Sequence, residues 1–244
     1  MESKSVVDEH LSRLENVQTR WSLLRSAGGP DSSMLDVRNA LVLRYVVPIR
    51  SYVQAIVRDE SAADEIAQDA VVRLLKGDFA GADPDRGRFR DLLKTALRNM
   101  VRNHWKKSNV RKAAPLEFDI SEEENDAADP WLDHWRGHLL ELAWGDLKAV
   151  EDASPGRFPH SVLKVRTDLP DSSSTDLAAE LSKRVGKEVK PDAFRQQLKR
   201  ARQRFAETLL SELRDGLDDP TPERIHDEVI ALGLYPWLKD KLEE

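Results

Sequence analysis

The sequence predicts an all-α protein made of two small helical domains joined by an acidic linker. Apolar residues recur at helical spacing in one segment after another, and no stretch shows the alternation of a strand. Charged residues make up 34% of the chain and aromatic residues only 6%, a balance that suits a helical protein better than a sandwich or barrel. With 244 residues and 40% hydrophobic content, the chain can bury two cores of this kind.

The N-terminal part is expected to hold two helices separated by a linker. Residues 7–24 carry apolar residues near helical spacing, and the sequence SAGGPDSS at 26–33 breaks this pattern. A second helix is expected over 37–57, where Pro48 should kink the helix or mark a join, because proline cannot donate the helical hydrogen bond.

Two further helices complete a compact three-helix unit with the helix over 37–57. Ser61 and Asp64 resemble a capping box, which predicts a helix over 62–76. The glycine-rich segment 77–87 is expected to be a loop, and the helix that follows it ends near Lys112.

This last helix is unusually basic. The segment 86–112 has ten cations and one acid, Asp91, so it is locally +9 in a chain whose formal net charge is −6. One face is apolar and is expected to be buried, and the cations follow a second stripe at steps of four: Arg90, Lys94, Arg98, Arg102 and Lys106. Beside the far end of that stripe lie Asn99, Asn103, His104 and Trp105.

Cations, amides and a flat aromatic are the groups that hold phosphates, base edges and base faces, so the stripe is a candidate nucleic-acid surface. A merely solvated charged face is the alternative, because most runs of charge are of that kind.

The second half opens with an acidic spacer and continues as helices. Residues 113–133 contain eight acids and no lysine or arginine, and 113–130 is too poor in apolar residues to predict stable structure. Helices are then expected over 131–150, which begins the second unit, over 160–169 and over 177–185, and finally from Pro191 or Asp192 to about Arg214.

The last two of these helices form a candidate helix-turn-helix, in which a first helix sets the angle and a second reaches into the major groove. The segment 183–204 has nine cations against two acids, a local +7. Off the apolar stripe, the second helix carries Arg195, Gln196, Lys199, Arg200, Arg202 and Gln203. This signal alone is weak, because many amphipathic helices share it.

Composition excludes several classes of function. The chain has no cysteine, so disulfides, thiolate zinc sites and cysteine nucleophiles are ruled out. His134 and His138 lie near Asp133 and Glu141 and could hold a metal, but histidines at a surface or an interface beside tryptophans are the stronger interpretation. No glycine-rich phosphate loop follows a strand. We therefore expect neither enzymatic activity, nor a cofactor, nor a metal.

No apolar run approaches the roughly 20 residues of a membrane span, and the N-terminus lacks the core of a signal peptide. The expected location is the cytoplasm, without membrane association.

Three segments together resemble bacterial RNA polymerase sigma factors of the extracytoplasmic-function (ECF) type of the sigma-70 family. SAADEIAQDAVVRLL (61–75) is similar to the polymerase-binding helix of that family, and GRFRDLLKTALRNMVRNHWKK (87–107) to its promoter-melting helices. STDLAAELSKRVGKEVKPDAFRQQLKRARQRF (174–205) is similar to its C-terminal helix-turn-helix, although the turn at 186–191 is longer than usual.

The resemblance implies a domain organisation. Residues 37–112 would form a region 2-like domain for promoter melting, 113–138 the acidic linker, and 139–214 a region 4-like helix-turn-helix domain. Residues 1–36 and 215–244 would be extensions that the resemblance does not cover.

It also implies a role for each candidate residue and a set of partners. The residues that would dock on the clamp helices of the largest polymerase subunit are Asp64, Glu65, Gln68, Asp69 and Arg73. Those that would bind and open the minus-ten element are Arg90, Lys94, Arg98, Asn99, Arg102, Asn103, Trp105, Lys106 and Lys107. Those that would contact the minus-thirty-five element are Lys190, Arg195, Gln196, Lys199, Arg200 and Arg202. Further expected partners are the flap of the second subunit and a regulatory protein such as an anti-sigma factor.

Two other classes of function remain open. A DNA-binding regulator or an RNA-binding adaptor could use the same basic helices without polymerase, but the acidic and amide face of the helix 61–75 would then have no purpose. A nucleic-acid-processing enzyme would need carboxylates clustered near the basic helices, whereas the acids lie mainly in the spacer.

The tail beyond residue 217 is predicted to contain one more helix and an apolar cluster. Thr221 and Pro222 can start the helix and Gly233 can stop it. The cluster consists of Leu234, Tyr235, Trp237 and Leu238. Such a patch should pack somewhere. We favour packing on the second domain over docking of a regulatory partner or an inactive arrangement of the two domains.

Overall fold

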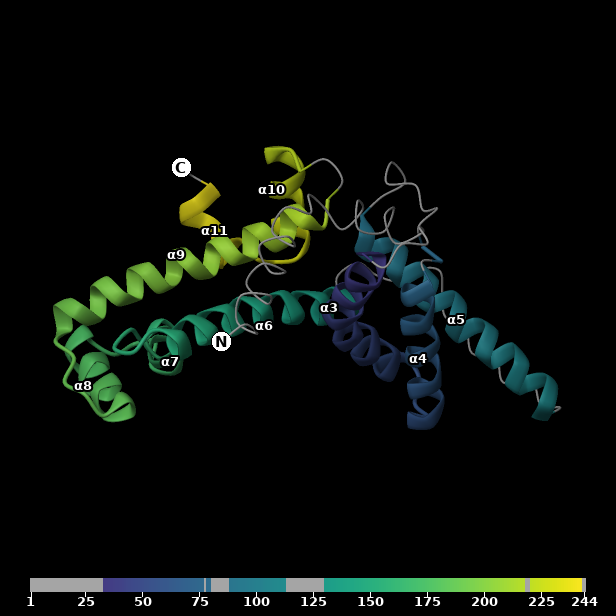
Figure 1. The fold of residues 1–244 in the computed structure, drawn as a ribbon, viewed down its shortest axis with the longest axis horizontal. Helices are drawn as coiled ribbons and strands as arrows, with labels where there is room; N and C mark the ends of the chain where they lie inside the picture. The colour runs from purple at the N-terminus through teal and green to yellow at the C-terminus, as the bar shows by residue number, and fades with distance from the viewer. Residues whose placement is uncertain (1–32, 77, 80–87, 113–129, 218–219, 243–244) are drawn as a thin grey trace. The chain divides into compact units, whose positions relative to one another are not determined.

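The computed structural model describes residues 33–76, 78–79, 88–112, 130–217 and 220–242 (Figure 1). Within these ranges the chain is helical and has no strand, which confirms the all-α prediction. The chain divides into two compact units: unit 1 contains residues up to Trp135 together with 214–225, and unit 2 contains 136–213 together with 226–244. The predicted helix at 7–24 and most of the predicted loop at 77–87 lie outside the described residues.

Three helices of unit 1 pack on one another: α3 (Ser33–Ile56), α4 (Glu60–Lys76) and α5 (Phe89–Lys112). Helix α3 continues through Pro48, so this proline does not divide the helix. The predicted start of α4 was wrong. Asp59 is the capping residue, because its Oδ1 atom accepts a hydrogen bond from the backbone N–H of Ala62 at 3.0 Å.

Aromatic side chains form the centre of unit 1. The ring of Trp135 stacks on that of Tyr45 with 5.5 Å between centroids and 7° between planes, and Trp131 packs edge-on against Tyr52 at 4.9 Å. Phe89, at the start of α5, lies 4.9 Å from Tyr45. Both tryptophans come from the beginning of α6 (Pro130–Ala153), so the first turns of this helix belong to unit 1 rather than to the second unit, where the sequence pattern placed them.

Unit 2 is built from the rest of α6 and from α7 (Pro159–Asp168), α8 (Ser174–Val185) and α9 (Pro191–Asp215). Helices α7, α8 and α9 share a cluster of buried apolar side chains that includes Val162, Leu177, Leu181, Phe194 and Ala201. Helix α9 runs alongside α6 (Figure 1). Between these two helices the ring of Trp144 packs edge-on against that of Phe205, with 5.3 Å between centroids.

Local signals set both ends of α8. The Ser173 hydroxyl accepts a hydrogen bond from the backbone N–H of Asp176, and Gly186 ends the helix in the left-handed region with φ 64°. The turn that follows is held by the hydroxyl of Ser182, which accepts from the N–H of Val189 at 2.9 Å. The turn between α8 and α9, at 186–190, is therefore longer than a tight one and yet hydrogen-bonded to α8.

The tail contains α10 (Pro222–Ala231) and α11 (Tyr235–Leu242), with Gly233 between them at φ 62°. From residue 226 onward the tail belongs to unit 2, where Leu232, Leu234 and Leu238 are 0% exposed. Arg136 donates to the carbonyl of Leu232 at 3.5 Å. From residue 226 onward the tail therefore packs into unit 2, as the favoured sequence interpretation proposes, whereas residues 220–225 belong to unit 1.

Because the tail is part of a core, truncating a buried residue in it should destabilise the protein. Leu238→Ala is expected to lower the free energy of unfolding by about 2–5 kcal/mol, measured by denaturant titration. Ile230→Ala, at a side chain that is 55% exposed, is the control and should change it by less than about 0.5 kcal/mol. Equal effects of the two substitutions would contradict the packing of α11.

Candidate nucleic-acid and protein interfaces

Helix α4 separates an apolar face from an acidic one. Its buried residues are Ala63, Ile66, Ala67, Ala70 and Leu74. On the opposite face Glu65, Gln68 and Asp69 are exposed, and Asp69 pairs with Arg73 at 3.3 Å. This face can contact a partner without any change to the core.

Asp64 differs from the other acids of this face, because it is bonded within unit 1. Its two carboxylate oxygens accept hydrogen bonds from Arg50 of α3 at 3.0 and 3.4 Å. Asp64 therefore also ties α4 to α3, a role that the sequence pattern did not indicate.

The cations of the α5 stripe become more exposed from the start of the helix toward its end. Arg90 is only 6% exposed and lies 3.3 Å from Asp91, whereas the sequence pattern placed it on the exposed face. Lys94, Arg98 and Arg102 are half-buried, and Lys106 is exposed. The cause is geometric: 3.6 residues make one turn, so a stripe with steps of four rotates around the helix as it advances. The accessible cations are concentrated at the far end of α5.

That far end also carries the amides and the aromatic residue. Asn99, Asn103 and Lys107 are exposed, while His104 and Trp105 are half-buried. This part of α5 lies beside α4, and the two helices line a groove of about 510 Å³. The groove residues are Glu65, Ile66, Asp69 and Arg73 from α4 and Met100, Asn103, His104, Lys106 and Lys107 from α5. The acidic face and the basic face, which the sequence analysis treated as separate, meet in this groove.

Unit 2 presents all the polar residues predicted for the helix-turn-helix. Lys190, Arg195, Gln196, Lys199, Arg200 and Arg202 are exposed. Arg195 is hydrogen-bonded to Asp192 one turn earlier in α9. Nearby, the carbonyl oxygen of the Gln197 side chain accepts from the backbone N–H of Phe158 at 3.3 Å and fixes the segment that precedes α7.

Ion pairs that the sequence did not predict set the orientation of the unit 2 helices. Arg204 of α9 donates two hydrogen bonds to Asp146 of α6, at 2.6 and 2.8 Å, and these bonds raise the pKa of Arg204. Asp168 of α7 pairs with Arg184 of α8 at 2.9 Å and with Lys164 at 3.0 Å. The hydrogen bonds from these two cations hold the pKa of the Asp168 carboxyl below its usual value.

The two histidines considered as metal ligands differ in burial: His138 is buried and His134 is half-buried. Among the residues that the structure describes, no group of three or more histidine, aspartate and glutamate side chains could hold a metal ion. Of the described helices, none combines the length and the apolar character that crossing a bilayer requires.

Comparison with known proteins bears on unit 1. Residues 41–111 match the family Sigma-70 region 2, over less than a third of the chain. This stretch covers most of α3, all of α4 and nearly all of α5. Searches of curated proteins and of solved structures found no match. The family match supports a sigma factor of the sigma-70 family, a class of non-enzymatic transcription initiation factors that bind RNA polymerase and recognise promoters.

The link between Arg204 and Asp146 makes a testable contribution to unit 2. Asp146→Asn is expected to lower the free energy of unfolding by roughly 1–2 kcal/mol, because it removes a charged partner from a bidentate pair. Asp152→Asn is the matched control: Asp152 pairs at 2.6 Å with Lys148 of its own helix, and the loss of this exposed pair should cost at most about 0.5 kcal/mol. Denaturant titration of both variants checks the difference, and equal values would contradict the positioning role of Asp146.

Proposed function

We propose that this protein is a sigma factor of the ECF type, which binds core RNA polymerase and directs promoter recognition and melting. The observation that carries the proposal is the coincidence of the Sigma-70 region 2 match with the three packed helices of unit 1. Inside that match, an acidic and amide face adjoins a surface of cations, amides and a tryptophan. The protein would act in the cytoplasm, without a cofactor.

The acidic face of α4 is the proposed docking site for the clamp helices of the largest polymerase subunit. Glu65, Gln68 and Asp69 are exposed and lie outside the core, so a partner can reach them. Asp64 and Arg73 border this face, each in an ion pair. A pure nucleic-acid binder would gain nothing from such a face, since carboxylates repel phosphates.

The far end of α5 is the proposed minus-ten surface. Asn99, Asn103, Lys106 and Lys107 are exposed there, with Trp105 half-exposed beside them. Cations that follow a backbone and an aromatic face that stacks on a base suit unpaired DNA better than a closed duplex. Arg102, half-buried, can present its guanidinium group along the same edge, whereas the Nε and Nη2 atoms of Arg98 and the side chain of Arg90 are buried.

The N-terminal half of α9 is the proposed minus-thirty-five surface. Arg195, Gln196 and Lys199 project from the second helix of a helix-turn-helix, the element that enters a major groove. Arginine and glutamine can each make two hydrogen bonds to a base edge, so this surface suits duplex DNA. The flap of the second polymerase subunit is the proposed protein partner of unit 2.

Charge reversal on α4 tests the polymerase contact. Glu65→Arg with Asp69→Arg should abolish co-purification with core RNA polymerase, because both side chains are exposed on the proposed contact. Helical content should hardly change, since neither side chain lies in the core. Asp227→Arg, at an exposed acid of α10, is the control and should leave assembly intact. Normal assembly of the double variant would show that α4 is not the docking helix.

The two DNA surfaces should act at different steps. Trp105→Ala with Asn103→Ala should leave closed-complex formation by the holoenzyme intact and impair strand opening, since a stacked base is worth roughly 1–3 kcal/mol. Arg195→Ala should instead weaken promoter binding by roughly 1–3 kcal/mol and relax the choice of upstream sequence. Permanganate footprinting separates opening from binding.

The free chain is a further arm of this experiment. It should bind duplex DNA poorly, because a formal net charge of −6 opposes contact with phosphates. Tight, sequence-specific binding by the free chain would favour a regulator that acts without polymerase.

A further inference from the structure

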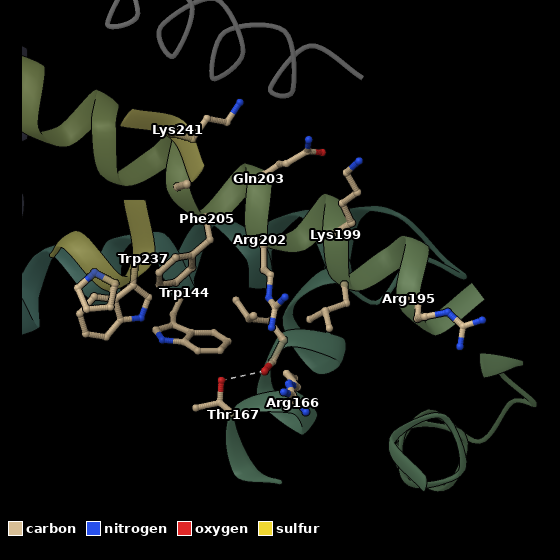
Figure 2. A pocket seen from close by; sticks show the side chains of 14 residues that line it. Trp144, Arg166, Thr167, Arg195, Lys199, Arg202, Gln203, Phe205, Trp237 and Lys241 are labelled. Carbon is tan, nitrogen blue, oxygen red and sulfur yellow. Dashed lines mark hydrogen bonds between the residues drawn. The ribbon is translucent and has the colours of Figure 1, made fainter. Parts of the chain in front are cut away.

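A second groove lies in unit 2, between the helix-turn-helix and the tail (Figure 2). It has a volume of about 700 Å³ and is lined by α6, α7, α9 and α11. Its apolar lining includes Trp144, Leu163, Leu198, Phe205 and Trp237. Figure 2 shows Trp144, Phe205 and Trp237 close together at one end, with Lys199 and Arg195 further along α9. The tail helix thus completes a groove that the helix-turn-helix alone would not form.

The charged side chains that line this groove all have one sign. They are Arg166 of α7, Arg195, Lys199 and Arg202 of α9, and Lys241 of α11. The groove lining contains no aspartate or glutamate. Nearby acids do pair with two of these cations: Asp192 with Arg195, and Glu207 with Lys241 at 3.6 Å. The groove therefore combines an apolar floor with an excess of positive charge, although the net charge of the whole chain is negative.

Trp237 is an apolar side chain of the groove that remains exposed to solvent. It is 45% exposed, whereas Leu234 and Leu238 of the same segment are 0% exposed and hold the tail in the core. Tryptophan and arginine are among the residues most enriched at the anchor points of protein contacts, and this groove contains both. Leu234 and Leu238 are enough to hold the tail in the core. The exposure of Trp237 is therefore better explained by a binding site than by the folding of the tail.

We propose that this groove binds an acidic amphipathic helix of a partner protein. A single helix, about 10–12 Å in diameter, can lay an apolar stripe into such a groove, while its flanking carboxylates meet the cations on the rim. Duplex DNA is a poorer fit, because the apolar floor offers nothing to phosphates and lies below the rim. The occupant is thus defined by two features together, an apolar stripe and negative charge on both sides of it.

The inference has a regulatory consequence that rests on the proposed function. Arg195, Lys199 and Arg202 belong both to the groove and to the proposed minus-thirty-five surface. A helix bound in the groove would neutralise these cations and cover part of the recognition face. Binding of the acidic partner and of the upstream promoter element would therefore exclude each other.

The experiment measures binding of synthetic peptides to the full-length free chain by fluorescence anisotropy. The probe is a labelled helical peptide of about 16 residues, roughly four turns, with leucine and tryptophan along one face and glutamate elsewhere. One matched peptide has lysine in place of glutamate, and another has serine in place of the apolar residues. Only the acidic amphipathic peptide should bind, and about 0.5 M salt should weaken its binding.

Substitutions in the chain then locate the site. Trp237→Ala should weaken peptide binding at least about tenfold, the usual loss when an aromatic anchor is removed, and Trp237→Phe should restore part of it. Ile230→Ala, at another exposed apolar residue of the tail, is the control and should bind like the unaltered chain. Thermal unfolding should change little in all three variants, since Trp237 is 45% exposed and Ile230 is 55% exposed.

Two results would overturn the inference. One is peptide binding that Trp237→Ala does not change or that the lysine peptide reproduces. The other is Trp237-dependent binding of a single-stranded oligonucleotide without binding of the acidic peptide, which would make the groove a nucleic-acid site.

Promoter binding by the holoenzyme is measured separately from peptide binding. If the acidic peptide does not bind but the holoenzyme binds the promoter, only the proposed groove is rejected. If the holoenzyme does not bind the promoter but the peptide binds and its binding depends on Trp237, only the assignment of the recognition face is rejected.

Discussion

Unit 1 depends on the packing of two tryptophans from α6 against two tyrosines from α3. Trp135 stacks flat on Tyr45, and Trp131 meets Tyr52 edge-on, so the beginning of α6 closes the core that α3, α4 and α5 leave open. Aromatic pairs of this kind contribute beyond the area that they bury. Helix α5 starts at Phe89, which contacts Tyr45, so the same cluster also positions the N-terminus of the basic helix.

The position of this cluster explains how an acidic chain can present a basic surface. Helix α5 begins with buried residues, and the cations of its stripe become exposed only several turns later. Arg90 lies near the aromatic cluster in sequence and is buried, whereas Lys106 and Lys107 lie at the far end and are exposed. The family match ends at residue 111, before α6 begins, so part of the core that supports the matched helices comes from outside the match.

The sequence predicted the elements well because their signals are local. Apolar spacing located α4, α5, α8 and α9, and Gly186 and Gly233 marked the ends of helices that the structure places within a residue or two of the expected positions. The N-cap of α4 is predicted at Ser61, because Ser61 and Asp64 resemble a capping box, but Asp59 makes the bond. Local patterns cannot choose between two capping residues two positions apart.

What depends on tertiary contacts could not be predicted. The burial of Arg90 requires knowing which turn of α5 meets the core, and the pairs of Asp146 with Arg204 and of Asp64 with Arg50 join residues that are 58 and 14 positions apart. The same holds for the groove beside Trp237, whose residues come from four helices. The sequence identified most of its cations as candidates for DNA contact, yet it contained no sign that the tail would lie beside them.

The distribution of tryptophan over the two units has a practical consequence. Trp131 and Trp135 are buried in unit 1, whereas Trp144 packs against Phe205 in unit 2 and Trp237 is half-open to water. Their emission should therefore differ in wavelength and in access to a soluble quencher. Since the chain has no cysteine, a single introduced thiol can carry an acceptor dye anywhere on the surface. A soluble quencher can thus separate the buried Trp131 and Trp135 from the more accessible Trp105 and Trp237, with no reporter added to either core.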